Sequence, residues 1–166
     1  MKRIVVLGGG ESGIGTALLA KQKEYEVFVS DKGEITKKYK EVLLNNEIEF
    51  EENQHSEAKV LNADVVMKSP GIPDHVSLID KLKQKSIPVI SEIEFACQFT
   101  DANIVGITGS NGKTTTAMLT HHVLKAGGLN IGLAGNIGDS FAAQVINQQY
   151  KSYVLELSSF QLDGIE

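Results

Sequence analysis

Short apolar runs alternate with segments of helical spacing along most of this chain of 166 residues. Residues 4–7 and 27–29 are wholly apolar, as expected of parallel strands that helices cover on both faces. A segment of helical period follows each of these runs, and such alternation is typical of α/β proteins. We therefore expect an α/β fold built on parallel sheets.

The spacing of apolar residues typical of strands and of helices also predicts the other elements. Ser91, with Glu94 three residues later, forms a capping box at a helix start. One helix is expected after the glycines that follow residue 7. Strands are further predicted at 48–50, 64–67, 88–90, 104–107, 129–133 and 153–157, and helices at 36–44, 77–85, 91–99, 113–125 and 140–147.

A glycine-rich segment at residues 106–115 lies between an apolar run and a helical segment. It misses the strict pattern G-x-x-x-x-G-K-[ST] by one residue, because Ile107 stands where the first glycine belongs. The remaining glycines still let backbone amides turn toward phosphate oxygens, while Lys113 can reach the terminal phosphates and Thr114 offers a hydroxyl to Mg²⁺. The alternative is a glycine-rich turn with a helix-capping threonine. The residues expected to bind ATP are Gly109, Ser110, Asn111, Gly112, Lys113, Thr114, Thr115 and Thr116.

A second glycine-rich loop, at residues 8–13, fits G-x-G-x-x-G between a strand and a helix, and Asp31 ends the next strand. This is the dinucleotide fingerprint with its ribose-binding acid, which taken alone suggests an NAD-linked dehydrogenase. The same geometry serves any nucleotide diphosphate at a helix N-terminus, and a packing turn without ligand is the remaining alternative. The loop therefore predicts an anion site beside an acid that binds hydroxyls.

The two loops divide the chain into two units. Residues 1–101 are expected to form a Rossmann-like domain, and residues 102–166 the first part of a central P-loop ATP-binding α/β domain. The second unit holds only about three strands, whereas doubly wound sheets usually have about five or six. We therefore expect this second domain to be truncated.

Composition and charge narrow the class of protein. A formal net charge of −5 without a basic stripe argues against nucleic acid. The apolar run at the amino terminus is too short for export or for crossing a membrane. Cys97 is the only cysteine, so no internal disulfide forms and a reducing compartment is expected. The chain is therefore expected to be cytoplasmic, without nucleic-acid or membrane partners. A monomer is also expected, although the sequence has no feature that determines the oligomeric state.

With these two glycine-rich loops, the chain resembles the Mur ligases of peptidoglycan synthesis. Three further segments carry the resemblance: Ser-Pro-Gly-Ile-Pro at 69–73, Gly-Asn-Ile-Gly at 135–138 and Tyr-Val-Leu-Glu-Leu-Ser-Ser-Phe-Gln-Leu at 153–162. The last segment is similar to the branch that adds D-glutamate to UDP-N-acetylmuramoyl-L-alanine. Family members have a UDP-binding domain, an ATPase domain and a C-terminal domain, and the resemblance covers the first and about half of the second.

The resemblance implies that the first loop binds the UDP part of the substrate rather than NAD. Glu11 and Ser12 would lie at the diphosphate, Asp31 near the uridine with Lys32 beside it, and Gly71 in the uracil pocket. Lys32-Gly33 departs from a family pattern that can end in arginine, which leaves the uracil contacts open. Asn136 would approach the substrate between the two domains.

The resemblance also implies a mechanism: the substrate carboxylate attacks ATP to give an acyl phosphate, which the amino group of D-glutamate then displaces. Lys113 and Glu156 would be catalytic, and Thr114 and Glu156 would be linked to Mg²⁺. The resemblance further implies a role in cell wall biogenesis, cell shape and cell division. Later family residues and the C-terminal domain are absent, so this chain is expected not to ligate by itself.

Two other classes stay open: an NAD-binding oxidoreductase or regulatory module, and a non-catalytic P-loop binding protein. Four histidines offer no metal cluster in the sequence. His55 and His75 are expected to be solvated, and the neighbours His121 and His122 to be structural, because adjacent helix positions face different directions. Cys97 is expected in the core.

Overall fold

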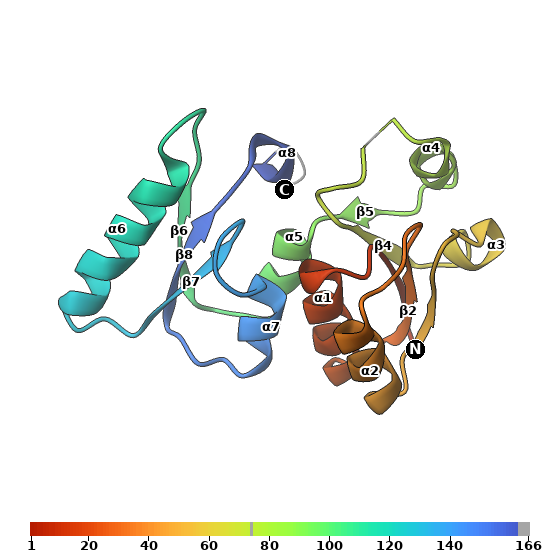
Figure 1. Cartoon of the computed structure of the whole chain (residues 1–166), viewed down its shortest axis with the longest axis horizontal. Coiled ribbons are helices and arrows are strands. Elements are labelled where there is room, and N and C mark those ends of the chain that lie inside the picture. Colours follow the sequence, from red (N-terminus) through yellow and green to blue (C-terminus); the bar gives the residue numbers. More distant parts are fainter. Residues whose placement is uncertain (74, 163–166) are drawn as a thin grey trace.

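The computed structural model describes residues 1–73 and 75–162, which form two parallel sheets with helices around them (Figure 1). The first sheet has five strands in the order β3-β2-β1-β4-β5. From β1 the chain adds β2 and β3 on one side of the sheet, and then β4 and β5 on the other side. The point between β1 and β4, where this order switches, is where α/β sheets of this kind place their ligands. The strands are β1 (Arg3–Leu7), β2 (Glu26–Ser30), β3 (Glu49–Glu51), β4 (Val65–Lys68) and β5 (Val89–Ile90).

Strand β1 shows why an unbroken apolar run is needed at the centre of this sheet. Ile4 and Val6 pack into one hydrophobic cluster, whereas Val5 and Leu7 pack into a second one. Alternate residues of a strand face opposite sides, so both faces of β1 are buried. The helices of this half are α1 (Glu11–Gln22), α2 (Lys37–Asn45), α3 (Glu57–Val60), α4 (Ser77–Gln84) and α5 (Glu92–Cys97).

The second sheet has three strands in the order β6-β8-β7, namely β6 (Asn103–Ile107), β8 (Ser152–Glu156) and β7 (Ile131–Gly135). Helix α6 (Lys113–Ala126) covers one face of it, and α7 (Phe141–Ile146) lies on the face toward α1 (Figure 1). A short helix α8 (Ser159–Leu162) follows β8. Ala117 of α6 packs with Val154 of β8, whereas Tyr153 and Leu155 face α7.

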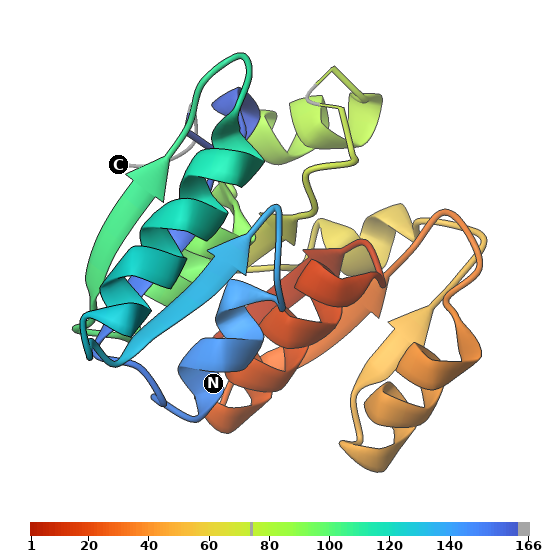
Figure 2. The same ribbon diagram turned by 60° about the vertical axis from the view of Figure 1, so that its left-hand side comes forward.

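The two halves share one hydrophobic core. Leu19 of α1, Phe95 of α5 and Phe141 of α7 belong to the same buried cluster. Figure 2 shows α7 beside α1. Helix α1 approaches α7 closely at Gly15, where a Cβ would lie 2.0 Å from Oγ of Ser140. The junction is therefore packed as a core.

The α/β class with parallel sheets is confirmed, and most predicted elements lie within two residues of their observed bounds. Ser91 caps α5 as predicted, because its Oγ accepts a hydrogen bond from the amide of Glu94 at 3.0 Å. The prediction for β7 was displaced by two residues at both ends, since the strand runs from Ile131 to Gly135. Helices α3 and α8 were not predicted. Within the described residues no helix combines the length and apolarity needed to cross a membrane.

Candidate functional site

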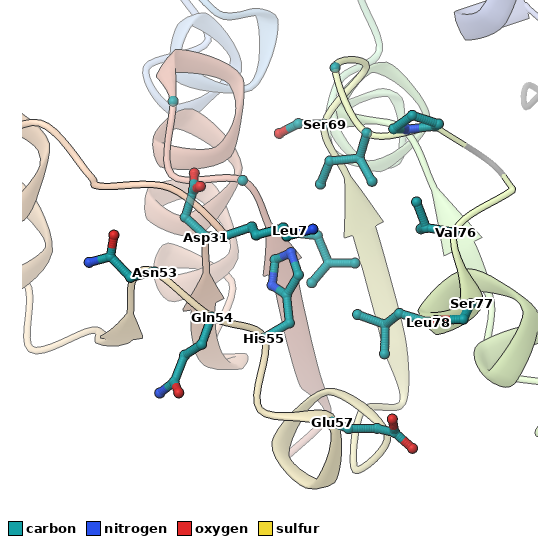
Figure 3. Close-up of a pocket in the computed structure, with 16 residues that line it drawn as sticks. Leu7, Asp31, Asn53, Gln54, His55, Glu57, Ser69, Val76, Ser77 and Leu78 are labelled. Atoms are coloured by element: carbon teal, nitrogen blue, oxygen red, sulfur yellow. The ribbon is translucent and has the colours of Figure 1, made fainter.

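A cavity of about 850 Å³ opens at the carboxyl ends of β1, β2 and β4 (Figure 3). Its walls come from the glycine loop after β1, from the segments after β2, β3 and β4, and from the start of α4. Three residues predicted to bind the uridine side of a substrate lie together in its lining: Asp31, Lys32 and Gly71. The switch point of the strand order thus coincides with a cavity large enough for a nucleotide.

The carboxylate of Asp31 holds the glycine loop. Its Oδ2 accepts a hydrogen bond from the amide of Gly9 at 2.6 Å, and its Oδ1 accepts one from the amide of Gly33 at 2.7 Å. Gly8 has a φ of +104°, and a Cβ there would lie 2.5 Å from Oγ of Ser69. Asp31 therefore links the segments that follow β1 and β2 through hydrogen bonds within the protein.

Glu11, Ser12 and Asn136 are not in the lining of this cavity. Glu11 opens α1 and lines a separate hollow that also includes Asp139 and Ser140. The peptide oxygen of Ser12 accepts a hydrogen bond from Oγ1 of Thr16 within the helix. The suggested roles of these three residues stay predictions.

His55 lies inside the cavity, so the expectation that it is solvated was wrong. The imidazole projects between Asp31 on one side and Val76 and Leu78 on the other (Figure 3). It is half-buried, and its Nδ1 lies 2.7 Å from Oγ of Ser30. Burial lowers the pKa of His55 below its ordinary 6.5, against the opposing charges of Asp31 and Glu51. Sequence reasoning missed this residue because its burial depends on the packing of distant segments.

Glu51 completes a buried polar group beneath the cavity. Its Oε1 accepts hydrogen bonds from Oγ of Ser30 at 2.7 Å and from the amide of Ser56 at 2.6 Å. Burial raises the pKa of Glu51, but these hydrogen bonds outweigh it, so the pKa lies below its ordinary value. The ionised carboxylate of Glu51 is therefore connected to His55 in the cavity lining through two hydrogen bonds that share Oγ of Ser30.

The second glycine loop connects the end of β6 to the start of α6. Gly109 and Gly112 have φ values of +146° and +75°, a region that favours glycine. Lys113 begins α6, and its Nζ donates a hydrogen bond to the peptide oxygen of Gly109 at 2.8 Å. The first turn of this 14-residue helix contains no acidic residue. No carboxylate within the first turn of the helix therefore offsets the positive charge at its start.

Glu156 ends β8 beside this loop. It is the register partner of Ile107, whose peptide oxygen accepts a hydrogen bond from the amide of Leu157 at 2.9 Å. Two residues earlier in the strand, Val154 packs toward α6, so Glu156 points to the same face of the sheet. Glu156 is buried, and its Oε2 has no hydrogen-bond partner among the described residues. A buried carboxylate oxygen without a partner is costly, and it fits a site that is completed by a cation.

No cluster of three His, Cys, Asp or Glu side chains within residues 1–73 and 75–162 could hold a metal ion by itself. Thr114, the other residue predicted to bind Mg²⁺, is exposed in the first turn of α6. A magnesium ion there would need phosphate oxygens as further ligands, which is how this ion is commonly held beside nucleotides.

The segment that follows β8 forms a local cap. Oε1 of Gln161 accepts hydrogen bonds from the amide of Ser158 at 2.9 Å and from its Oγ at 3.0 Å. Gln161 is buried. Ser158 and Gln161, three positions apart in this run, are thus joined by reciprocal hydrogen bonds, because the amide of Gln161 also donates to Oγ of Ser158 at 3.3 Å.

Comparison with known proteins gives two family matches. Residues 3–78 match a model described as the MurD N-terminal domain, and residues 107–165 match one described as the Mur ligase middle domain. The chain is 62% identical over 165 residues to a UDP-N-acetylmuramoylalanine--D-glutamate ligase of Christiangramia forsetii. It is 58% identical to the enzyme of that name from Bacteroides thetaiotaomicron. Both alignments cover 99% of this chain but 37% of the relative.

Solved structures agree with this assignment. A pseudomurein peptide ligase type C from Methanothermus fervidus matches 96% of the chain, with a TM-score of 0.57 and 29% identity, over 33% of its own length. A UDP-N-acetylmuramate:L-alanyl-gamma-D-glutamyl-meso-diaminopimelate ligase from Neisseria meningitides matches 96% of the chain and 55% of its own length, with a TM-score of 0.60. At 24% identity this second likeness supports the fold alone. The two domain matches, together with the high identity along almost the whole chain, show that the chain belongs to the Mur ligase family.

Proposed function

We propose that the protein is an ATP-dependent ligase that adds D-glutamate to UDP-N-acetylmuramoyl-L-alanine in peptidoglycan synthesis. In this proposal residues 1–101 are the UDP-substrate domain, and residues 102–166 are the first part of the ATP-binding domain. The observation that carries the proposal is the pairing of two sites in one chain. A nucleotide-sized cavity lies at the switch point of the first sheet, and a phosphate loop with a buried, partnerless Glu156 lies at the second. The chain spans 37% of the length of the relatives that carry this activity in their names.

The cavity suits a uridine diphosphate in its composition. Apolar side chains at Ile72, Val76 and Leu78 offer surface to a flat base, while Asp31 and Lys32 offer polar contacts at the same rim. The proposed diphosphate position is the start of α1, where free backbone amides can bind phosphate oxygens beside the negative charge of Glu11 in the first turn. Glu11 and Ser12 would lie there, Gly71 would line the base pocket, and Asn136 would face the sugar side.

Lys113 is the proposed phosphate ligand of the second site. In the structure its ammonium group donates to the peptide oxygen of Gly109. Binding of ATP would exchange this neutral partner for a phosphate oxygen, which makes a stronger, charge-assisted hydrogen bond. The amides of residues 109–115 would surround the same phosphates, because the loop turns at its two glycines of positive φ. The amide of Thr116 already donates to the peptide oxygen of Gly112 at 2.9 Å, so Thr116 would contribute its hydroxyl.

Glu156 and Thr114 are the proposed residues for Mg²⁺. Carboxylate and hydroxyl oxygens suit this hard ion, and it would supply positive charge beside the phosphates of ATP. Lys113 adds a second positive charge that lowers the repulsion between the substrate carboxylate and ATP. These residues therefore bring two anions together, which any ligase that activates a carboxylate must achieve. The proposal places the protein in the cytoplasm as a monomer.

Calorimetric titration of the 166-residue chain tests both sites. We expect saturable binding of UDP-N-acetylmuramoyl-L-alanine and none of NADH. ATP with Mg²⁺ should bind the unaltered chain, and Lys113→Ala should weaken this binding at least about tenfold, the loss of roughly one charge-assisted hydrogen bond. Lys125→Ala, in the last turn of the same helix, is the matched control and should bind normally. Preference for NADH over the uridine compound would overturn the proposal in favour of an oxidoreductase.

A further inference from the structure

The hydrogen bonds under the cavity determine which nitrogen of His55 carries a proton. Nδ1 of His55 and Oε1 of Glu51 both lie 2.7 Å from Oγ of Ser30, on either side of one hydroxyl. Ser30 is fully buried, so this hydroxyl has no access to solvent. A hydroxyl has a single proton to donate and can accept from the other partner.

Glu51 takes that proton. Its pKa lies below the ordinary value, so the carboxylate is ionised at neutral pH and can only accept hydrogen bonds. The peptide oxygen of Gln54 is the other acceptor near Oγ of Ser30, but it is 3.5 Å away. The shorter, charge-assisted bond to Glu51 is the stronger one. Oγ of Ser30 is then left to accept, and Nδ1 of His55 must donate to it.

This assignment leaves Nε2 of His55 as a bare acceptor. A neutral imidazole carries one proton, and here that proton is on Nδ1. Burial keeps the ring neutral at pH 7, because it lowers the pKa of His55. No hydrogen bond to Nε2 is found within residues 1–73 and 75–162, and the ring lines the cavity. A half-buried acceptor in a cavity favours a ligand that brings an N–H group to it.

We propose that Nε2 of His55 accepts a hydrogen bond from the imide N–H of a uracil ring, and that His55 thereby selects uracil over cytosine. The proposal rests on the cavity being the UDP site described above. Uracil has a donor at N3 between two carbonyl oxygens, whereas cytosine has a bare acceptor at N3. A cytosine would therefore set two lone pairs against each other at Nε2, which leaves both groups unpaired.

The other polar groups of the cavity agree with this pattern. Lys32, Asn53 and Gln54 line the cavity and carry N–H donors, which the two carbonyl groups of uracil require. Asp31 and Glu57 also line the cavity, but both oxygens of Asp31 already accept backbone amides, and Oε2 of Glu57 accepts a hydrogen bond from Nζ of Lys81. Nε2 of His55 therefore offers an unused lone pair on a ring that its hydrogen bond to Ser30 holds in one orientation.

Nitrogen NMR tests the tautomer without any ligand. Long-range ¹H–¹⁵N correlation on the labelled chain at pH 7.5 should show His55 protonated on Nδ1, with the chemical shift of Nε2 typical of an unprotonated nitrogen. A His55 signal from the opposite tautomer would overturn the inference, whatever the cavity binds.

Binding tests the selection. The probes are UDP-N-acetylmuramoyl-L-alanine and its cytidine counterpart, titrated into the unaltered chain, His55→Leu and the control His122→Leu, whose imidazole is exposed on α6. The unaltered chain and the control should prefer uridine by at least about tenfold, as expected for one unsatisfied polar pair. His55→Leu should reduce the preference to about twofold or less.

The outcomes separate this inference from the proposed function. If the unaltered chain binds the uridine compound but His55→Leu keeps its full preference, the inference is overturned and the UDP site stands. If the unaltered chain binds neither compound, both are overturned. Should His55→Leu fail to fold, His55→Gln serves in its place, because glutamine keeps a polar side chain at this position. The NMR result on the unaltered chain decides the tautomer in either case.

Discussion

Oε1 of Glu92 accepts hydrogen bonds from Oγ of Ser140 at 2.6 Å and from the amide of Ala142 at 3.0 Å, and so joins α5 to the first turn of α7. Glu92 is 2% exposed. Ser140 caps α7 as well, because its Oγ also accepts from the amide of Ala143. One buried carboxylate therefore connects the two halves of the molecule at the point where their shared core closes.

Replacement of Glu92 by alanine should lower the free energy of unfolding by about 2–3 kcal/mol. The change leaves the hydroxyl of Ser140 and the amide of Ala142 buried without this partner, and unsatisfied groups of this kind cost about 1–3 kcal/mol. Chemical denaturation measures the difference. Glu94→Ala on the same helix is the control, since only its backbone amide contributes to the cap. Equal stability of the two variants would show that the connection contributes nothing.

Replacement of Gly15 by alanine tests the same junction from α1. A Cβ there would lie 2.0 Å from Oγ of Ser140 and 3.1 Å from the amide of Ala143. Alanine is the better helix former by about 1 kcal/mol, but overpacking of a closed interface costs about 1–3 kcal/mol. We therefore expect a lower midpoint of thermal unfolding. Gly71→Ala is the control, because its Cβ would meet no heavy atom within 4 Å.

The individual strands could be predicted from the sequence, but the junction could not. A buried parallel strand is apolar on both faces, as at Ile4 and Val5, so its signal is local. Glu92 could only be interpreted as a charged residue in a helix's first turn, because its partner Ser140 is 48 positions away. His55 was misjudged for the same reason, since its burial depends on tertiary contacts.

The error at β7 has a local cause. The prediction started the strand directly after Gly127-Gly128, whereas Leu129 still belongs to the helix ending. Its amide donates to the peptide oxygen of Leu124 at 3.1 Å, and Gly128 has a φ of +86°. This is the Schellman arrangement, in which the residue after the left-handed glycine closes the helix. The strand therefore begins at Ile131, two residues later.

Acid should destabilise the protein through His55 before it does so through Glu51. The pKa of His55 is lowered by folding, so the unfolded chain binds the proton more tightly and stability falls as the pH drops below about 6.5. The pKa of Glu51 is also lowered, and its contribution is lost only as the pH falls below about 4.5. Thermal unfolding between pH 8 and 5 measures the first window.

The variant His55→Asn identifies the group responsible. It removes the titrating ring, so its stability should change less between pH 7 and pH 5.5 than that of the unaltered chain. His122→Asn removes an exposed imidazole and should leave the pH dependence as it was. If both variants follow the unaltered chain, another group titrates in this window.

Glu156 should show opposite effects on stability and on nucleotide binding. Its Oε2 is buried without a partner in the described part of the chain, so Glu156→Leu removes a desolvated carboxylate and should raise the free energy of unfolding by about 1–2 kcal/mol. The same change removes the proposed Mg²⁺ ligand, and the stabilisation that ATP with Mg²⁺ gives the unaltered chain should disappear. Thermal unfolding with and without ATP and Mg²⁺ measures both effects. Asp139→Leu changes an exposed acid near the end of β7 and should retain the stabilisation by nucleotide. A Glu156→Leu chain that is less stable than the unaltered one would show that the carboxylate has a structural role, and one that still responds to ATP with Mg²⁺ would remove Glu156 from the proposed metal site.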